Sequence, residues 1–255
     1  MIIALDVGNT NIVLGIVEND VVRFSARLST DRSKTEDEYA VFFKNILELH
    51  DVNPKEIQGG IISSVVPPLT NVLKRAIELV SGSTPLVVGP GVKTGLNILI
   101  DNPKQLGSDL VVVAVAALQE YPAPLILLDM GTATTFSAID SKGNFQRVVI
   151  LPGAGVSQDA LTNRTSQLPH ISLDAPPRVI GRNTIDSMQS GMLYGQASMV
   201  DGMIERIQEE LDGPATVIAT GGLAKQIIPH CKKHILYDND LLIKGLLFIY
   251  KKNTR

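Results

Sequence analysis

Two segments of the chain repeat one short pattern, roughly half a chain apart. The first runs from Ile3 to Asn11 and the second from Ile126 to Thr135. In each, an apolar run ends in Asp-x-Gly, hydroxyl or amide residues follow, and a second apolar run begins. This order is typical of a strand, a tight turn and a returning strand. A chain that carries it twice is expected to fold into two similar halves.

The residue types at both turns suit the binding of phosphate and of a cation. Gly8 and Gly131 allow a ligand to approach the backbone closely, and the neighbouring amides and hydroxyls can donate to phosphate oxygens. Asp6 and Asp129, at the strand ends, can hold a cation or its water shell. We therefore expect a nucleoside triphosphate in a cleft between the halves. A plain hairpin turn uses the same residue types, with the Asp bonding its own turn amides, and remains an alternative.

Composition excludes several other classes of protein. At 255 residues, with 44% hydrophobic and 19% charged residues, the chain suits one large or two modest globular domains. A net charge of -3 and an aromatic fraction of 4% argue against nucleic-acid binding. No apolar run reaches the roughly 18 residues of a membrane span, and no signal-peptide pattern opens the chain. Cys231 is the single cysteine, which excludes a disulfide within the chain. We expect a soluble cytoplasmic protein that binds neither nucleic acid nor membrane.

The expected elements follow the same order in both halves. In the first half we expect strands at Ile2–Leu5, Ile12–Val17, Val21–Leu28, Gly60–Val65 and Pro85–Val88. We expect helices there at Thr35–Leu49 and Leu69–Val80. Thr35 and Glu38 should form a capping box at the start of the first helix. In the second half we expect strands at Leu125–Leu128, Thr134–Ile139, Phe145–Ile150 and Ala215–Ala219, and helices at Ser157–Thr162, Thr184–Leu211 and Gly222–Ile228. A helix at Asp109–Glu120 should link the halves, and a last helix, capped by Asn239, should span Asn239–Lys251.

These elements predict an α/β fold of two domains, residues 1–117 and 118–255, each a mixed sheet flanked by helices. The last helix could pack on the first domain.

The two turns resemble those of the superfamily of acetate and sugar kinases, actin and the ATPase domain of heat-shock chaperones. The chain as a whole is similar to the type III pantothenate kinases. The matching motifs occur in family order along the whole chain: Asp6-Val-Gly-Asn-Thr-Asn11, Thr35-Glu-Asp-Glu-Tyr39, Ser63-Ser-Val-Val-Pro67, Gly91-Val-Lys-Thr-Gly-Leu-Asn97, Asn102-Pro103, Asp129-Met-Gly-Thr-Ala-Thr-Thr135, Leu151-Pro-Gly153, Gly181-Arg-Asn-Thr184, Gln189-Ser-Gly191 and Ala219-Thr-Gly-Gly-Leu-Ala224.

The resemblance implies two ribonuclease-H-like halves and a homodimer. It also implies ATP-dependent phosphorylation of pantothenate to 4'-phosphopantothenate, the first step of coenzyme A biosynthesis. Mg2+ and a monovalent cation, K+ or NH4+, are implied as cofactors.

By the same resemblance, Asp6 lies beside the ATP phosphates and Mg2+, and Asp129 belongs to the monovalent-cation site. Thr184 is implied to be a residue of the pantothenate and dimer site, although it could equally be the N-cap of the helix that follows. The other implied nucleotide contacts are Gly8, Asn9, Thr10, Asn11, Gly131, Thr132, Thr135, Gly221 and Gly222. Gly221 and Gly222 could also form an ordinary strand-to-helix turn.

Asp109 is the candidate catalytic base. Gly107-Ser108-Asp109 occupies the place of the family's Gly-Ala-Asp-Arg, whose Asp is the general base and whose residues border the substrate. Phosphoryl transfer uses a carboxylate that accepts the proton of the substrate hydroxyl. Without the resemblance, capping of the following helix would be the simpler role for Asp109.

The chain departs from the family pattern on the acceptor side. Leu110 stands where the family has an Arg that would pair with the pantothenate carboxylate, and Ile100 stands where a Tyr is usual. Val113 replaces a common Asn, and Arg147-Val148 replaces a Gly-Gly pair. Arg147, Arg164 or Arg182 could supply a substitute cation.

Two functions remain open at this point. One is an active pantothenate kinase. The other is a divergent nucleotide-binding paralogue with a different acceptor or a regulatory role. The nucleotide turns suit both, whereas Leu110, Ile100 and Arg147-Val148 favour the second.

Overall fold

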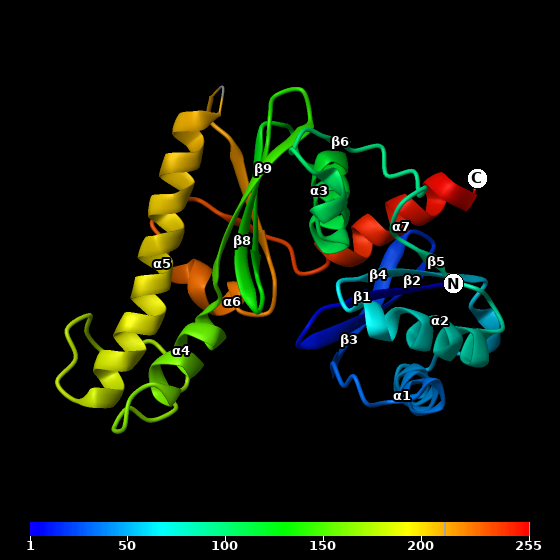
Figure 1. The fold of residues 1–255 in the computed structure, drawn as a ribbon, viewed down its shortest axis with the longest axis horizontal. Coiled ribbons are helices and arrows are strands. Elements are labelled where there is room, and N and C mark those ends of the chain that lie inside the picture. Colours follow the sequence, from blue (N-terminus) through cyan, green and yellow to red (C-terminus); the bar gives the residue numbers. More distant parts are fainter. Residues whose placement is uncertain (212, 255) are drawn as a thin grey trace. The chain divides into compact units, whose positions relative to one another are not determined.

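The computed structural model describes residues 1–211 and 213–254. They form two compact units. Unit 1 comprises Met1–Leu96, Asp101–Gln119 and Asp240–Arg255, and unit 2 comprises Asn97–Ile100 and Glu120–Asn239. Each unit is an α/β layer structure built on its own sheet (Figure 1).

Unit 1 is built on a mixed sheet of β1 (Ile2–Val7), β2 (Asn11–Glu18), β3 (Val21–Ser29), β4 (Gly59–Ser64) and β5 (Leu86–Val87). The strand order is β3-β2-β1-β4-β5. β1 is central because it pairs antiparallel with β2 and parallel with β4. Its burial on both faces explains why Ile2–Val7 has an almost continuous apolar sequence.

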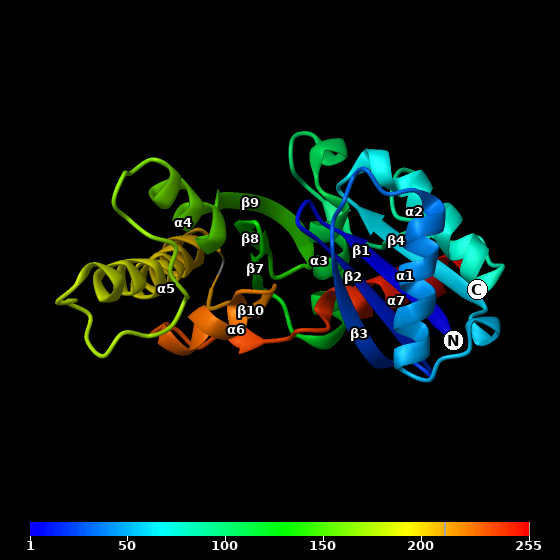
Figure 2. The same cartoon turned by 90° about the horizontal axis from the view of Figure 1, so that it is seen from below.

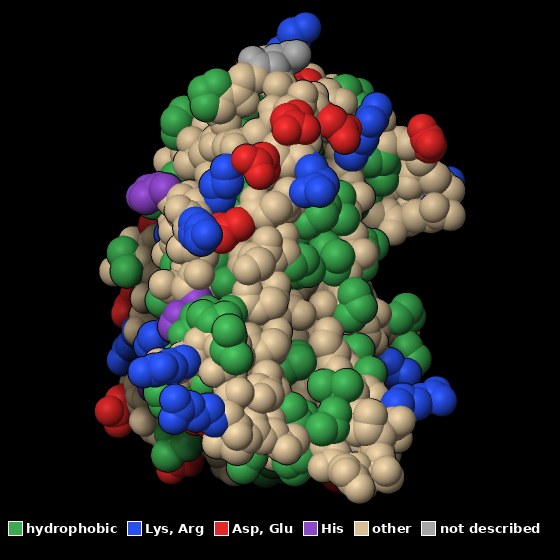
Figure 3. Space-filling model, turned by 90° about the vertical axis from the view of Figure 1, so that its left-hand side faces the viewer, with side chains coloured by type: hydrophobic (Ala, Val, Ile, Leu, Met, Phe, Trp, Pro, Cys, Tyr) green, Lys and Arg blue, Asp and Glu red, His purple; other side chains and the backbone are tan. Residues whose placement is uncertain are grey.

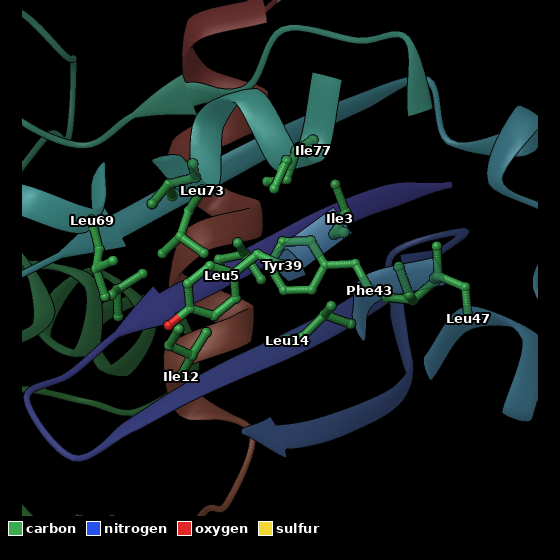
Figure 4. Close-up of a cluster of buried hydrophobic side chains, with 14 of the residues drawn as sticks. Ile3, Leu5, Ile12, Leu14, Tyr39, Phe43, Leu47, Leu69, Leu73 and Ile77 are labelled. Atoms are coloured by element: carbon green, nitrogen blue, oxygen red, sulfur yellow. The ribbon is translucent and has the colours of Figure 1, made fainter. Parts of the chain in front are cut away.

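One face of this sheet is covered by α1 (Glu36–Leu49) and α2 (Pro67–Ser81), which lie side by side. Figure 4 shows the core between them, where Tyr39 and Phe43 of α1 and Leu73 and Ile77 of α2 meet alternate residues of β1 and β2. The Tyr39 hydroxyl stays satisfied because it donates to Asp31 O at 2.8 Å. The Thr35/Glu38 capping box at the start of α1 is confirmed.

The opposite face of the unit 1 sheet carries α7 (Leu241–Thr254), with α3 (Ser108–Glu120) packed on α7. Glycines allow both contacts. A Cβ on Gly15 of β2 would lie 2.8 Å from Ile243, and one on Gly245 of α7 would lie 2.1 Å from the Val112 carbonyl oxygen of α3. The last helix therefore packs on the sheet of the first half, at β1 and β4.

Unit 2 repeats the arrangement with β7 (Leu125–Met130), β8 (Ala133–Ile139), β9 (Asn144–Pro152), β10 (Thr216–Thr220) and β11 (Leu236–Tyr237). The strand order is β11-β10-β7-β8-β9-β6, in which β6 (Asn97–Ile98) is an added edge strand. β7 takes the place of β1, because it pairs antiparallel with β8 and parallel with β10. The expected duplication of a mixed sheet flanked by helices is confirmed.

The helices of unit 2 are α4 (Ala154–Asn163), α5 (Thr184–Glu210) and α6 (Ala224–Ile227). Figures 1 and 2 both show α5 alongside the sheet. Met192, Val200 and Ile204 of α5 pack with Ile126, Leu128 and Phe136 of the sheet. Short 3-10 turns lie at Pro54–Glu56, Pro103–Gln105 and Ile228–His230.

Several expected boundaries were wrong. The helix expected at Gly222–Ile228 spans only Ala224–Ile227 and continues as a 3-10 turn, because Pro229 cannot donate a helical hydrogen bond. α4 begins at Ala154 rather than Ser157, and α7 begins at Leu241 rather than Asn239. The two-residue strands β6 and β11 were not expected, since so short a pairing has no periodic sequence signal.

Candidate active site

The turn after β1 is held in shape by backbone and side-chain hydrogen bonds. Gly8 N donates to Asn11 O at 2.9 Å, which closes the turn. Thr30 braces it from the end of β3, since its amide donates to Thr10 O at 2.9 Å and its hydroxyl to Gly8 O at 2.7 Å. Asn9 and Thr10 are exposed at the tip, and Arg32 donates to Asn9 Oδ1 at 3.0 Å. The turn thus offers exposed donors on a fixed backbone.

Asp6 lies one residue before the end of β1 and is only 8% exposed. Its register partners are Val13 on β2 and Ser63 on β4. Paired residues of neighbouring strands point to the same face of a sheet, so the side chains of Asp6 and Ser63 share the face opposite the core of α1 and α2. This face also carries α7 and α3.

Asp109 lies in the first turn of α3 and is partly buried. Burial raises the pKa of its carboxyl above the ordinary 3.8, while a hydrogen bond from Leu110 N to Oδ1, at 2.9 Å, lowers the pKa in part. Gly107 makes room for this carboxylate, because a Cβ there would lie 2.3 Å from Asp109 Oδ1. The alternative that Asp109 caps the following helix is wrong, because α3 already begins at Ser108 and the Asp109 carboxylate accepts from the amide of the next residue. Asp109 is a partly buried carboxylate of raised pKa.

Ser108, the first residue of α3, is joined to the end of β4. Its Oγ lies 3.0 Å from Ser63 Oγ and accepts from Ser64 N at 3.1 Å. The start of α3, and with it Asp109, is thereby attached to the strand that neighbours Asp6.

The turn after β7 has the same form in unit 2. Gly131 N donates to Ala133 O at 3.0 Å, and Asp129 is the register partner of Thr135 on β8 and Thr220 on β10. Thr135 Oγ1 is buried and has no hydrogen-bond partner among the described residues. A buried hydroxyl without a partner next to a carboxylate suits a bound cation or water.

Two glycines close the backbone around this second turn. A Cβ on Gly153 would lie 2.4 Å from Gly131 O and 2.5 Å from Thr132 O. Gly221 has φ +99, and a Cβ there would lie 2.6 Å from Asp129 Oδ1. Gly222, which follows it, is exposed. The Leu151-Pro152-Gly153 motif therefore has a packing function at the turn, which its sequence alone did not specify.

The departures from the family pattern lie in different places. Leu110 is half-buried in α3 of unit 1, and Val113 is 2% exposed on the same helix. Ile100 belongs to unit 2. The Arg147 side chain is 80% exposed on β9 and pairs with Glu210 at 3.6 Å, while Val148 is the register partner of Ser137.

Thr184 is the exposed first residue of α5 and does not cap it. Asn183 is the N-cap, because its Oδ1 accepts from Asp186 N at 2.9 Å. Thr184 and Arg182 border an open cavity of about 640 Å³, whose lining also includes Leu161, Leu168, Met188 and Met192.

Sequence reasoning missed three contributors to these turns: Thr30, Ser63 as a partner of Ser108, and Gly153 as a packing residue. Only Ser63 and Gly153 stood in quoted motifs, and no local pattern marks Thr30. Among residues 1–211 and 213–254, no group of three or more His, Cys, Asp or Glu side chains could hold a metal. In the same ranges, no helix is long and apolar enough to cross a membrane.

The two units define the class of protein, an α/β protein of two ribonuclease-H-like halves. Similar folds occur in the activator of 2-hydroxyisocaproyl-CoA dehydratase from Clostridium difficile, solved with bound ADPNP (TM-score 0.55, 15% identity, 97% of this chain and 92% of that chain). Component A of (R)-2-hydroxyglutaryl-CoA dehydratase from Acidaminococcus fermentans is also similar (TM-score 0.57, 14% identity, 99% and 98%).

The type III pantothenate kinase family model matches residues 2–206. Curated type III pantothenate kinases from Exiguobacterium sp. and Halalkalibacterium halodurans are each 46% identical to this chain, over 100% of both chains. One from Moorella thermoacetica is 45% identical over the same share. The chain belongs to the type III pantothenate kinase family.

Proposed function

We propose that this protein transfers the γ-phosphoryl group of ATP to the primary hydroxyl of pantothenate, as the first step of coenzyme A biosynthesis. Membership of the family over the full length of the chain supports the reaction. The observation that carries it on this chain is Asp109, a partly buried carboxylate of raised pKa at the start of a helix that is tied to the strand next to Asp6.

Asp109 acts as the general base. As the acceptor oxygen bonds to the γ-phosphorus, the bond from phosphorus to the bridging oxygen breaks, ADP leaves and the hydroxyl proton passes to Asp109. A carboxylate whose pKa is raised by burial holds that proton better than an exposed one. The exposed donors of the Gly8–Asn11 and Gly131–Thr135 turns bind phosphate oxygens, and Gly221 and Gly222 contact the nucleotide.

Each proposed cation would be held by one protein carboxylate rather than by a complete set of protein ligands. Mg2+ is usually held by one or two carboxylates together with substrate phosphates, and Asp6 at its strand end provides one such ligand. It would neutralise charge on the transferred phosphoryl group when bound. K+ or NH4+ fits beside Asp129, where the buried Thr135 hydroxyl has no partner among the described residues.

Homodimer formation is part of the proposal, with Thr184 at a shared acceptor site. The apolar side chains of α5 are mostly used inside unit 2, because Met188, Met192, Val200, Ile204 and Ile207 are buried there. Other apolar side chains of unit 2 remain exposed, foremost Ile180 at 86% and Ile150 at 69%. Figure 3 shows apolar side chains among charged ones on the side that carries α5.

A second candidate function is phosphorylation of a different alcohol, or nucleotide binding without turnover. Leu110 favours it, because an aliphatic side chain cannot form the charge-assisted pair that a carboxylate acceptor requires. Val113 adds little support for this second function, because its side chain is buried and therefore has a packing role in α3.

A coupled assay of the purified protein with ATP, Mg2+, K+ and pantothenate tests the proposal. We expect ADP and 4'-phosphopantothenate to form in equal amounts. Asp6→Asn should abolish turnover and weaken Mg-ATP binding in calorimetry, while the exposed Asp37→Asn in α1 should change neither. Tight ATP binding with no product from pantothenate would favour the second function. Unchanged binding and rate in Asp6→Asn would remove Asp6 from the site.

A further inference from the structure

A buried pair of serine hydroxyls joins α3 to β4 within unit 1. Ser63 is fully buried near the end of β4, and Ser108 is the first residue of α3. Their Oγ atoms are 3.0 Å apart. Two further contacts connect Ser108 Oγ to the Ser64 backbone, one to its amide at 3.1 Å and one to its carbonyl oxygen at 3.3 Å.

Hydrogen-bond accounting shows that the Ser108 hydroxyl is engaged within unit 1. A serine hydroxyl has one proton to donate and two lone pairs that accept. Ser108 Oγ accepts from Ser64 N, and its one proton can go either to Ser64 O or to Ser63 Oγ, because either serine can be the donor of the hydroxyl pair. In both arrangements the Ser108 proton is used inside unit 1.

Each serine of the pair neighbours one of the two carboxylates in the proposed reaction. Ser63 is the register partner of Asp6, and both side chains are on the same face of the sheet. Ser108 directly precedes Asp109 in the chain, and the room beside it for the Asp109 carboxylate is provided by Gly107. The hydroxyl pair therefore connects the strand next to Asp6 with the helix turn that carries Asp109.

We propose that Ser108, held by Ser63, is a positioning residue that sets the Asp109 carboxylate relative to the phosphate end of β1. This inference rests on the proposed kinase function, in which Asp109 is the base and Asp6 lies beside the phosphates. In this role Ser108 acts through the placement of Asp109.

The physical consequence is a loss of rate rather than of nucleotide binding. Without the Ser108 hydroxyl, the Ser63 hydroxyl and Ser64 N each lose a hydrogen-bond partner, so the first turn of α3 can shift. A misplacement of about 1 Å in a reacting group can cost on the order of 10²-fold in rate. The Gly8–Asn11 turn keeps its own braces from Thr30 and is not affected.

The experiment is a double-mutant cycle on the full-length protein with Ser108→Ala, Ser63→Ala and the double variant. Ser81→Ala is the matched control, because that hydroxyl bonds only its own helix backbone, at Ile77 O, and Ser83 N. Three quantities are measured: kcat, the KM for ATP, and hydrogen exchange at the Ser64 amide. The last does not depend on activity.

We expect each single variant to lose about tenfold or more in kcat, with the KM for ATP within about twofold of the wild type. The double variant should be no slower than the slower single variant, because both remove the same bond. Ser64 amide exchange should accelerate in Ser108→Ala and stay unchanged in Ser81→Ala.

Each contrary result is distinct. Wild-type kcat in Ser108→Ala with fast Ser64 exchange would overturn the positioning role while leaving the kinase function intact. Additive losses in the double variant would overturn the pairing with Ser63. A wild-type protein that transfers no phosphate to pantothenate would overturn the kinase function, and the inference with it. If Ser108→Ala does not fold, Ser63→Ala tests the same bond from its other end.

Discussion

At the scale of single residues, the environment of Asp109 has opposite effects on its proposed catalytic role and on the stability of the fold. Burial raises the pKa of its carboxyl, which suits a proton acceptor but makes the charged form costly to the folded state. The folded protein therefore holds the Asp109 proton more tightly than the unfolded chain does. Stability should fall as pH rises from the ordinary 3.8 through the raised folded pKa, and the cost persists at neutral pH.

Asp109→Asn should separate the effect on catalysis from the effect on stability. We expect kcat to fall by a factor on the order of 10²–10⁴, because the proposed base is gone, while the Tm at pH 7 rises because a partly desolvated charge is removed. The gain in Tm should shrink as the pH approaches 4 and the wild-type carboxyl takes up a proton. Thermal unfolding at several pH values, with kcat measured in parallel, tests both signs. A Tm that drops at pH 7 would mean that the carboxylate is stabilised by its hydrogen bonds more than it is destabilised by burial.

We expect the neighbouring Leu110 to weaken the binding of the acceptor carboxylate. A hydrogen bond to a charged group is worth roughly 1.5–3 kcal/mol, or about one to two decades in affinity. We expect a high KM for pantothenate and an ordinary one for ATP, and Leu110→Arg should lower the former by about that factor. Leu110→Met is the control, since it keeps an apolar side chain of similar size. If the wild-type protein already binds pantothenate tightly, another cation has replaced the family's Arg, and Arg147, Arg164 and Arg182 become the residues to test.

At the scale of elements, both Asp-x-Gly turns depend on segments that arrive from elsewhere in the chain. Thr30 supports the turn between β1 and β2, and the end of β9 supports the turn between β7 and β8. In the second case Gly153 N also donates to Thr132 O at 3.1 Å. The shape of each turn is therefore a tertiary property as much as a local one.

Gly153→Ala tests this support. Its Cβ would meet two backbone oxygens, so we expect unfolding to become about 1–3 kcal/mol easier and the affinity for Mg-ATP to fall as the Gly131–Thr132 backbone shifts. Gly155→Ala is the matched control two residues on, in α4, where a Cβ meets nothing within 4 Å. There the substitution should stabilise by about 0.5–1 kcal/mol through helix propensity. Urea unfolding and calorimetric titration measure both effects, and equal results for the two variants would contradict the packing argument.

At the scale of the whole molecule, the oligomeric state can be tested directly. Ile180 is 86% exposed in unit 2 and Leu49 is 80% exposed in unit 1, so neither contributes much to the fold of its own unit. We expect a dimer by light scattering at micromolar protein. Ile180→Glu should shift it toward monomer, while Leu49→Glu should not. A monomeric wild-type protein would contradict the dimer, and a dimer insensitive to Ile180→Glu would place the interface elsewhere.

The sequence by itself determined the features that depend on neighbours along the chain. The alternation of apolar runs located the central strands of both sheets. The Asp-x-Gly repeat located the two turns, and Thr35 with Glu38 specified the start of α1. Each of these is fixed by backbone geometry and side-chain chemistry within a few residues, so a local pattern can encode it.

Only the tertiary structure decided which distant residues meet. It joined Ser63 to Ser108, placed Gly153 against the Gly131–Thr132 backbone, packed α7 on the sheet of the first half, and paired Arg147 with Glu210 in the open. Such contacts depend on how elements stack after the chain collapses, and a hydroxyl or a glycine has no periodic signature that reveals its partner. Asp109 shows the difference most clearly, because its residue type follows from the sequence, whereas its burial and its raised pKa follow from what packs around it.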